Sequence, residues 1–331
     1  MQLFETISPE PVTDQHRAFE ASRPGRLGEI LRFDGVDGRD VYNPSVPFKL
    51  DGMTVMAGRV ESRDGHGSVT MFFTPSKDGV WRPIAGAPTL ELEDPFVTFA
   101  GEQLILGGVR VEWEDTPPGA PPVAHWCTDF YRGRSLDGLR RFATGPDQMK
   151  DIRLLQLRDS RVAIFTRPQG AVMEPLGCIA KIGFTLADSL DDVTPEAIKN
   201  APLLYDHFLP DEWGGCNQLF ELSNGLIGAI GHKSWGEMID GVHVLHYYSM
   251  AFALDPDARR MTPTKIIADR ACFPDGPAKE PRLRDVTFTA GIVRNDDGTA
   301  DLYTGLSDCQ VGLLRIEDPL SEYERLGVDQ E

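Results

Sequence analysis

The chain has 331 residues and a net charge of −18, which argues against nucleic acid or an anionic membrane surface as a partner. A hydrophobic content of 41% and a charged content of 25% are typical of a globular protein that can bury a large core. Because the negative charge repels phosphorylated compounds at long range, any phosphate site must be built locally from arginine and lysine.

The cysteine content indicates a reducing compartment. Five cysteines are an odd number, and no C-x-x-C pair occurs, so neither a disulfide framework nor a zinc knuckle is expected. The first residues, MQLFET, show no basic region followed by an apolar run, and no apolar run of about 18 residues occurs in the chain. We therefore expect a cytoplasmic protein with neither a signal peptide nor a transmembrane helix.

Taken in chain order, the sequence predicts an all-β protein. Residues 1–38 contain turns but no periodic element, and the four prolines of 114–123 predict a surface loop. Short helices are predicted at 135–142 and at 194–199, the second with Thr194 as its N-cap. Elsewhere, short runs rich in Val, Ile, Phe, Tyr and Thr alternate with Asp-Gly, Asn-Gly and Pro-Gly turns, which is the pattern of successive strands.

One hairpin shows this pattern most clearly. The charged residues Lys150, Asp151 and Arg153 open an apolar strand that ends at Leu157, and a second strand after a short turn ends before Arg167. Charged side chains at the start of a buried strand destabilise the fold unless they are paired with opposite charges or bind a ligand. Four other stretches of the chain begin in the same way.

The five stretches each carry one Asp or Asn before an apolar strand, and these markers are Asn43, Asp94, Asp151, Asn217 and Asp285. Neighbouring markers lie 51 to 68 residues apart, enough for about four strands, which is one propeller blade. We therefore predict a single domain over 1–331, a five-bladed β-propeller with the active site in its central funnel and with 1–38 packed on it as an extension. Alternatively, the markers only cap turns before strands.

Asp94 is the first candidate for chemistry. It stands in E-D-P-F, where the proline favours an extended backbone and projects the carboxylate from the start of a strand. Two carboxylates flanking a sugar bond are the usual machinery of glycoside hydrolysis. The same rim is rich in cations, which are Arg59, Lys150, Arg153, Arg167, His232, Lys279, Arg282 and Arg284. Since arginine and lysine grip phosphate oxygens, these cations favour an enzyme that handles phosphate, unless they only neutralise neighbouring acids.

Aromatic residues near the markers would suit the apolar face of a sugar ring, or else belong to the core; they are Tyr42, Trp213, Tyr247 and Tyr248. By alternation, one of the two adjacent tyrosines is expected in the core. No spacing of His, Cys, Asp and Glu predicts a metal site, and the Gly-Gly pairs lack the strand-to-helix turn of a nucleotide fingerprint. We expect neither a metal nor a bound cofactor.

Long motifs between residues 40 and 318 carry a family resemblance; they include DVYNPSVPF, AGRVE, EDPFVTF, GPDQMKDIRLLQL, FTRPQG, EWGGCNQ, NGLIGAIGH and LRDVTFTAGI. The chain resembles the β-1,2-mannan mannosyltransferase/phosphorylase family, which is related to the inverting β-mannoside phosphorylases. The resemblance implies a five-bladed propeller and an inverting reaction at a mannosyl anomeric carbon. Inorganic phosphate, as co-substrate, would release α-mannose 1-phosphate from a β-1,2-mannooligosaccharide. The reverse reaction would transfer mannose from mannose 1-phosphate, or in some members from GDP-mannose.

The motifs also imply residue roles. Asp94 would be the general acid or base. Phosphate would be held by Arg59, Lys150, Arg167 and His232. The predicted substrate-binding residues are Asn43, Glu61, Asp151, Arg153, Trp213, Asn217, Tyr247, Arg282 and Asp285. The segment GRVESRDGHGS departs from the family near His66, where an acidic residue is expected, so acceptor preference stays open. Two other functions also stay open: a propeller glycoside hydrolase acting on β-mannosides, and a sugar-binding propeller without catalysis.

Overall fold

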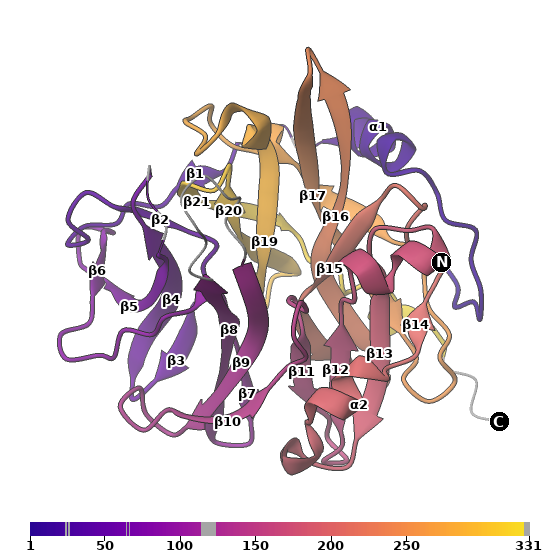
Figure 1. Cartoon of the computed structure of the whole chain (residues 1–331), viewed down its shortest axis with the longest axis horizontal. Coiled ribbons are helices and arrows are strands. Elements are labelled where there is room, and N and C mark those ends of the chain that lie inside the picture. Colours follow the sequence, from indigo (N-terminus) through magenta and orange to yellow (C-terminus); the bar gives the residue numbers. More distant parts are fainter. Residues whose placement is uncertain (24, 26, 64, 66, 114–123, 328–331) are drawn as a thin grey trace.

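The computed structural model of the chain describes residues 1–23, 25, 27–63, 65, 67–113 and 124–327. The predicted all-β class is confirmed, because the described residues form 21 strands and only two short α-helices. Most strands belong to five antiparallel groups of four, here called units 1 to 5 (Figure 1). The predicted loop at 114–123 and the predicted departure at His66 lie outside the described residues.

The units follow one another along the chain. Unit 1 consists of β2 (Asp40–Tyr42), β4 (Met53–Glu61), β5 (Val69–Pro75) and β6 (Trp81–Pro83), and β3 (Phe48–Leu50) also pairs with β4. Unit 2 consists of β7 (Glu93–Ala100), β8 (Gln103–Trp113), β9 (Ala124–Gly133) and β10 (Arg140–Thr144). Unit 3 consists of β11 (Arg153–Gln156), β12 (Val162–Thr166), β13 (Ile182–Ala187) and β14 (Leu203–Leu204).

The last two units are joined. Unit 4 consists of β15 (Trp213–Glu221), β16 (Ile227–Ile239), β17 (Val242–Leu254) and β18 (Lys265–Ala268). Unit 5 consists of β19 (Asp285–Arg294), β20 (Thr299–Leu306), β21 (Gln310–Glu317) and, from the start of the chain, β1 (Glu29–Ile30). A short parallel pairing of β17 with β19 links these two units into one sheet.

Hydrophobic clusters between adjacent units form the core. For example, Ile105 and Phe130 of unit 2 pack with Ile164 of unit 3, and Met56 of unit 1 packs with Val311 of unit 5. Neighbouring units also contact one another, through β4 and β7, β7 and β11, β11 and β15, and β15 and β19, while β2 of unit 1 contacts β20 and β21 of unit 5. The arrangement is therefore propeller-like, with the starts of successive units brought together at the centre of the molecule.

Helices are few. The prediction at 194–199 is confirmed by α2 (Pro195–Lys199), where Thr194 Oγ1 accepts a hydrogen bond of 3.2 Å from the N–H of Ala197. The predicted helix at 135–142 is wrong, because the pairing of β10 with β9 extends the chain from Arg140 onward. Short 3₁₀ helices are η1 (Gly170–Val172), η2 (Glu174–Leu176), η3 (Leu190–Asp192), η4 (Arg270–Cys272), η5 (Pro281–Leu283) and η6 (Tyr323–Arg325). No helix among the described residues is long and apolar enough to span a membrane.

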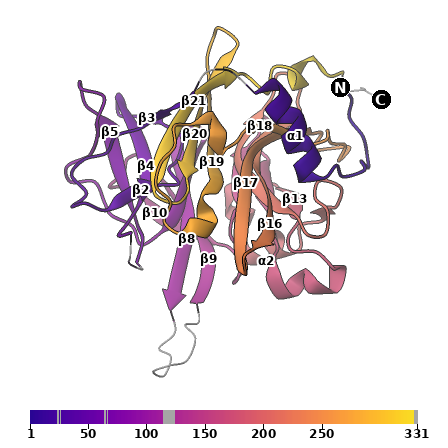
Figure 2. The same ribbon diagram turned by 90° about the horizontal axis from the view of Figure 1, so that it is seen from above.

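The first 38 residues are more ordered than predicted. They form α1 (Val12–Ser22), which packs on β16 and β18 as Figure 2 shows, and β1, which completes unit 5. Lys233 holds this segment against unit 4. Its fully buried ammonium donates to the Glu10 carbonyl at 2.8 Å and pairs with Glu212 at 3.3 Å. The sequence pattern missed α1 because these tertiary contacts, rather than an apolar stripe, hold the helix.

Candidate active site

A cavity of about 290 Å³ opens where the starts of the five units meet. Its polar lining residues are Asn43, Arg59, Asp94, Lys150, Asp151, Arg167, His232, Tyr247, Lys279, Glu280, Arg282 and Asp308. Leu245, Leu283, Val286 and Phe288 supply its apolar surface. The predicted acid, Asp94, and the four residues predicted to hold phosphate therefore share one cavity.

Backbone conformation places three of the markers. Asn43, Asp94 and Asp151 are all in the left-handed region, with φ of 42°, 47° and 58°. Asn and Asp tolerate this region better than most residues. The recurrence of one unusual conformation explains why the same two residue types recur at the cavity end of units 1, 2 and 3.

Asp94 is held by one of its two oxygens. Oδ1 accepts a hydrogen bond from Asn43 Nδ2 at 2.9 Å and from Arg59 Nη1 at 3.1 Å. Every hydrogen bond from the described residues to this carboxylate ends on Oδ1. The carboxylate is therefore fixed in orientation, with Oδ2 left to exchange a proton with a ligand.

Arg59 is surrounded by acids. Besides Asp94, its guanidinium contacts Glu93 Oε1 at 3.1 Å and Glu61 Oε2 at 3.2 Å, and its Nε donates to Ser68 Oγ at 2.8 Å. Burial alone would lower the pKa of Arg59, but Asp94 and then Glu93 raise it above its usual value. Burial also raises the pKa of Glu93 despite this arginine. We call Asn43, Arg59, Glu61, Glu93 and Asp94 the acidic cluster.

Glu61 stands behind this arginine and does not line the cavity. Its carboxylate also accepts hydrogen bonds from Tyr42 Oη and Lys279 Nζ. Burial would raise the pKa of Glu61, but Arg59, Lys279 and Tyr42 together lower it. Glu61 therefore supports Arg59 and Lys279 and is one contact removed from a ligand in the cavity.

A second set of residues brings cations to the cavity, in contrast to the acidic cluster. Arg167 Nε lies 2.9 Å from Asp151 Oδ2, and both side chains are buried. Burial alone would raise the pKa of Asp151, but Arg167 and the other nearby cations lower it below its usual value. The terminal nitrogens of Arg167, like Lys150 Nζ, make no hydrogen bond to a described residue. We call Lys150, Arg167, His232 and Tyr247 the phosphate wall, after the anion that sequence analysis predicted for the first three.

His232 belongs to this wall as a neutral ring. Its Nδ1 lies 2.8 Å from Asn217 Oδ1, and its ring stacks on Tyr247 with a centroid separation of 5.4 Å. Burial lowers the pKa of His232 to about 3, although Asp151 opposes the shift. Trp213 supports the wall from outside the cavity, because its Nε1 donates to Tyr247 Oη at 3.0 Å. Trp213 is thus placed to position Tyr247 without touching a ligand in the cavity.

Two predicted substrate-binding residues lie between this cavity and another. Arg153 and Asn217 line a second cavity of about 270 Å³, walled by Phe48, Phe96 and Phe220 among others. Arg153 Nε donates to the Asn217 carbonyl at 2.8 Å, and its guanidinium lies 3.9 Å from the centroid of the Phe96 ring. Burial lowers the pKa of Arg153. The structure therefore does not place Arg153 against a ligand in the first cavity, and Asn217 reaches that cavity only through His232.

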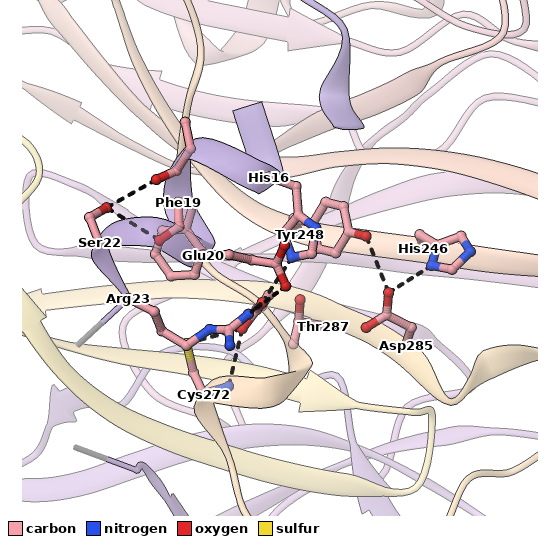
Figure 3. A network of polar contacts seen from close by, with 12 residues as sticks. His16, Phe19, Glu20, Ser22, Arg23, His246, Tyr248, Cys272, Asp285 and Thr287 are labelled. Atoms are coloured by element: carbon pink, nitrogen blue, oxygen red, sulfur yellow. Dashed lines mark hydrogen bonds and ion pairs between the residues drawn. The ribbon is translucent and has the colours of Figure 1, made fainter. Parts of the chain in front are cut away.

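Asp285 does not reach the cavity either. Its carboxylate accepts hydrogen bonds from His246 Nδ1 at 2.7 Å and from Tyr248 Oη at 3.2 Å (Figure 3). Strand register gives the reason: the bulge of β15 falls at Asn217, whereas that of β19 falls at Ala290. By register the fifth unit has an alanine where the fourth has an asparagine, so Asp285 is not a fifth marker.

The same network contains the one group of possible metal ligands among the described residues. Ligand atoms of His16, Glu20 and Asp269 all lie within 4.8 Å of one another. Arg23 already donates to the Asp269 oxygen that lies 2.9 Å from His16 Nε2. The carboxylate is therefore neutralised by the protein itself, and the group ties α1 to η4 at a distance from the cavity lining.

Sequence analysis missed Asp308 and left Lys279 without a role. Asp308 comes from the turn between β20 and β21, so it shares no register with the markers and no motif signals it. Burial, which outweighs the opposing Arg59, raises the pKa of the Asp308 carboxyl. Lys279 had been counted only among the cations of the rim, and its contacts with Tyr42 and Glu61 join it to the acidic cluster. The cavity thus holds an oriented acid, a carboxyl with a raised pKa, and a wall that contains two cations.

The cavity lies within a region that matches a known protein family. Residues 17–322 match a family described as "Protein of unknown function (DUF1861)", and the match includes every residue that lines the cavity. The chain belongs to this family. Among curated proteins, no sequence matches the chain significantly.

Solved structures relate this DUF1861 chain to enzymes that act on mannose. A mannose phosphorylase from Leishmania mexicana, solved in complex with a phosphate ion, is 37% identical over 94% of both chains, with a TM-score of 0.85. A GDP-Man-dependent mannosyltransferase from the same organism is 33% identical over 93% of this chain and 94% of that one, with a TM-score of 0.83. A β-1,2-mannobiose phosphorylase from Listeria innocua is 13% identical over 98% and 99% of the two chains, with a TM-score of 0.61, and shares the fold.

Proposed function

We propose that the protein is an inverting β-1,2-mannoside phosphorylase and mannosyltransferase. It converts a β-1,2-mannooligosaccharide and inorganic phosphate reversibly into α-mannose 1-phosphate and the shortened sugar. The activity is supported by two relatives above 30% identity, one a mannose phosphorylase and the other a mannosyltransferase. The β-1,2 linkage and the inversion come from the resemblance of the motifs.

The proposed scaffold is a single five-bladed β-propeller over residues 1–331, with 1–38 packed on it. Its support is the ring of strand contacts between neighbouring units and the five hydrophobic clusters, of which the fifth joins units 1 and 5. In such a scaffold the blade starts converge on one funnel, which is where the cavity lies. The reaction is proposed to need no metal and no bound cofactor.

One observation carries the proposed chemistry: Asp94, oriented with Oδ2 unused, shares its cavity with Arg167 and Lys150, whose terminal nitrogens make no hydrogen bond to a described residue. The carboxylate of Asp151 in the same cavity is already paired with Arg167 Nε. A hydrolase needs a second carboxylate to activate water, whereas phosphate is itself a nucleophile. Arg167 and Lys150 would hold the phosphate in line with the anomeric carbon, which supplies much of the rate through positioning. Charge-assisted hydrogen bonds from arginine are suited to this task.

The reaction then proceeds in one displacement. A phosphate oxygen forms a bond to the anomeric carbon while the bond from that carbon to the leaving sugar oxygen breaks. The electron pair of the broken bond stays on the leaving oxygen, which takes up a proton that Asp94 supplies, directly or through a sugar hydroxyl. Asn43 and Asp308 would hydrogen-bond the mannosyl hydroxyls. Backside attack by phosphate makes the product the α-anomer.

A direct experiment is to incubate the protein with β-1,2-mannobiose, with and without inorganic phosphate, and to follow mannose 1-phosphate by chromatography. We expect formation of mannose 1-phosphate and dependence of turnover on phosphate. Cleavage to two mannose molecules without phosphate would show a hydrolase instead. Binding of the sugar without any turnover in either direction would show a sugar-binding protein.

The second candidate donor is GDP-mannose, because the relative at 33% identity depends on it. Incubation with a β-1,2-mannooligosaccharide acceptor and either mannose 1-phosphate or GDP-mannose separates the two. The cavity volume of about 290 Å³ accommodates a mannosyl phosphate more readily than a complete nucleotide sugar, so we expect faster chain extension from mannose 1-phosphate.

A further inference from the structure

The contact between Asn217 and His232 fixes where the imidazole hydrogen lies. With the amide of Asn217 in the orientation that the structure gives it, Oδ1 lies 2.8 Å from His232 Nδ1, and because an amide oxygen only accepts, Nδ1 carries the hydrogen and donates it. Burial lowers the pKa of His232 to about 3, so the ring is neutral under ordinary conditions. A neutral ring that is protonated at Nδ1 has a lone pair at Nε2.

Nε2 is the part of His232 that the protein leaves unused. The ring lines the cavity and is fully buried, and Nε2 has no hydrogen-bond partner among the described residues. A buried polar atom without a partner is destabilising unless a ligand satisfies it. Because Nε2 can only accept, the ligand group beside it has to bring a hydrogen.

We propose that Asn217 and His232 together select a protonated oxyanion, with His232 Nε2 accepting the hydrogen of a P–OH group of phosphate. This inference rests on the proposed function and adds a specificity-determining pair to it. Sulfate has the same shape but carries no hydrogen at neutral pH. One of its oxygens would face Nε2 with no hydrogen between them, and the two lone pairs would repel each other. Arsenate carries the same O–H group as phosphate and is therefore accepted.

The selection also orients the nucleophile. With its protonated oxygen on His232, hydrogen phosphate presents unprotonated oxygens to Lys150, Arg167 and the anomeric carbon. One of these oxygens attacks while the leaving sugar oxygen takes up the proton supplied by Asp94. The product therefore forms as the monoanion of mannose 1-phosphate, with its remaining P–OH group still on Nε2. In the reverse direction, the monoanion is the donor that fits the wall.

The first test measures anion binding to the free protein by titration calorimetry at neutral pH, with no mannoside present. We expect phosphate and arsenate to bind with dissociation constants within about threefold of each other, and sulfate at least about tenfold more weakly, since an unmade hydrogen bond to a charged group commonly has an effect of this size. Sulfate binding as tightly as phosphate would mean that Nε2 carries the hydrogen and would overturn the proposal. Failure to bind phosphate at all would overturn the proposed function as well.

The second test removes the residue that sets the tautomer. Asn217→Leu frees the ring to protonate at Nε2, so sulfate should gain relative to phosphate and the preference should fall from at least about tenfold to below about threefold. A merely structural role of Asn217 would weaken all three anions equally and leave the ratio unchanged. Asn200→Leu, at an exposed asparagine after α2, is the matched control and should keep the wild-type ratio.

The tautomer of the wild-type ring can also be measured without any variant. Nitrogen-15 NMR of protein labelled at histidine distinguishes a protonated Nδ1 from a protonated Nε2. We expect the His232 signals of the Nδ1–H form in the ligand-free protein. Signals of the Nε2–H form would contradict the proposal, even if Asn217→Leu does not fold.

Discussion

The acidic cluster and the phosphate wall share one cavity, but they use their arginines differently. Arg59 directs its guanidinium at Asp94, Glu93 and Glu61, with its Nε on a serine. Arg167 contacts Asp151 through Nε and keeps its terminal nitrogens free of hydrogen bonds to described residues. Sequence analysis assigned both arginines to phosphate, because a sequence shows charge but not which donors are already occupied.

The comparison separates two kinds of cation. A guanidinium with three carboxylate partners fixes their positions, whereas a guanidinium with one partner retains donors for an anion. We therefore expect Arg167 to determine phosphate affinity and Arg59 to determine the geometry of Asp94. Substitution of Arg167 should mainly change the phosphate concentration needed for half-maximal rate, and substitution of Arg59 should mainly change the turnover number.

The largest effect is expected at the acid itself. Asp94→Asn keeps the contacts to Asn43 and Arg59 approximately in place but cannot donate an acidic proton, so turnover should fall by about 10²- to 10⁴-fold. Phosphate affinity, measured by calorimetry, should stay within about threefold of wild type, since Asp94 belongs to the other side of the cavity. The matched control is Asp285→Asn, whose carboxylate lies outside the cavity lining. If Asp94→Asn retained half of the wild-type turnover, Asp94 would not be the proton donor.

The next largest effect is expected at the phosphate wall. Arg167→Ala removes the terminal donors and should weaken phosphate binding by about 10- to 100-fold, the range for lost hydrogen bonds to a charged group. It also leaves Asp151 buried without its partner, so a lower thermal midpoint is expected in the same protein. Initial rates at varied phosphate concentration measure the first effect and thermal unfolding the second.

Arg59→Ala is the contrasting variant. It should lower the turnover number more than it raises the phosphate concentration needed for half-maximal rate, because its partners are the acids and not the anion. Equal losses of phosphate affinity in the two variants would remove the distinction between the two sides.

Some of this arrangement was readable from the sequence. Asn43, Asp94 and Asp151 were predicted together because each precedes an apolar strand. The extended backbone predicted at Asp94 is wrong, and the left-handed position that the three residues share selects the same two residue types. The hairpin that begins after Asp151 was predicted because its turn is local. Repeated local conformation leaves a repeated sequence signal.

The predictions failed for residues whose position depends on strand register or on tertiary contacts. Asp285 fits the repeat in chain order, but the bulge that brings Asn217 inward in β15 falls on Ala290 in β19. Asp308 comes from the turn between β20 and β21, and Lys279 precedes a 3₁₀ helix, so neither lies at a repeated position. Their place in the cavity depends on how whole units pack, which no local pattern records.

Asp308 allows a pH-dependent prediction. Because its pKa is raised in the folded protein, its neutral form contributes stability that is fully present below the usual carboxyl pKa near 4 and is lost as pH rises through the raised value. Asp308→Asn mimics the neutral form and should remove this part of the pH dependence. Thermal unfolding of the two proteins from pH 4 to 9 measures it. Parallel curves for wild type and variant would show that Asp308 is ionised throughout.

The smallest effect is expected at Trp213, which touches the phosphate wall only through Tyr247. Trp213→Phe keeps the edge-to-face ring contact but removes the hydrogen bond from Nε1 to Tyr247 Oη, so stability should fall by about 0.5–1.5 kcal/mol and phosphate affinity by less than about threefold. Trp126→Phe is the matched control, because Trp126 Nε1 is buried without a partner among the described residues, so its removal leaves none of their acceptors unsatisfied. Urea unfolding and calorimetry of the two variants compare them directly. If both variants behaved alike, Tyr247 would be held by its stacking on His232, and the wall would depend on ring packing more than on this hydrogen bond.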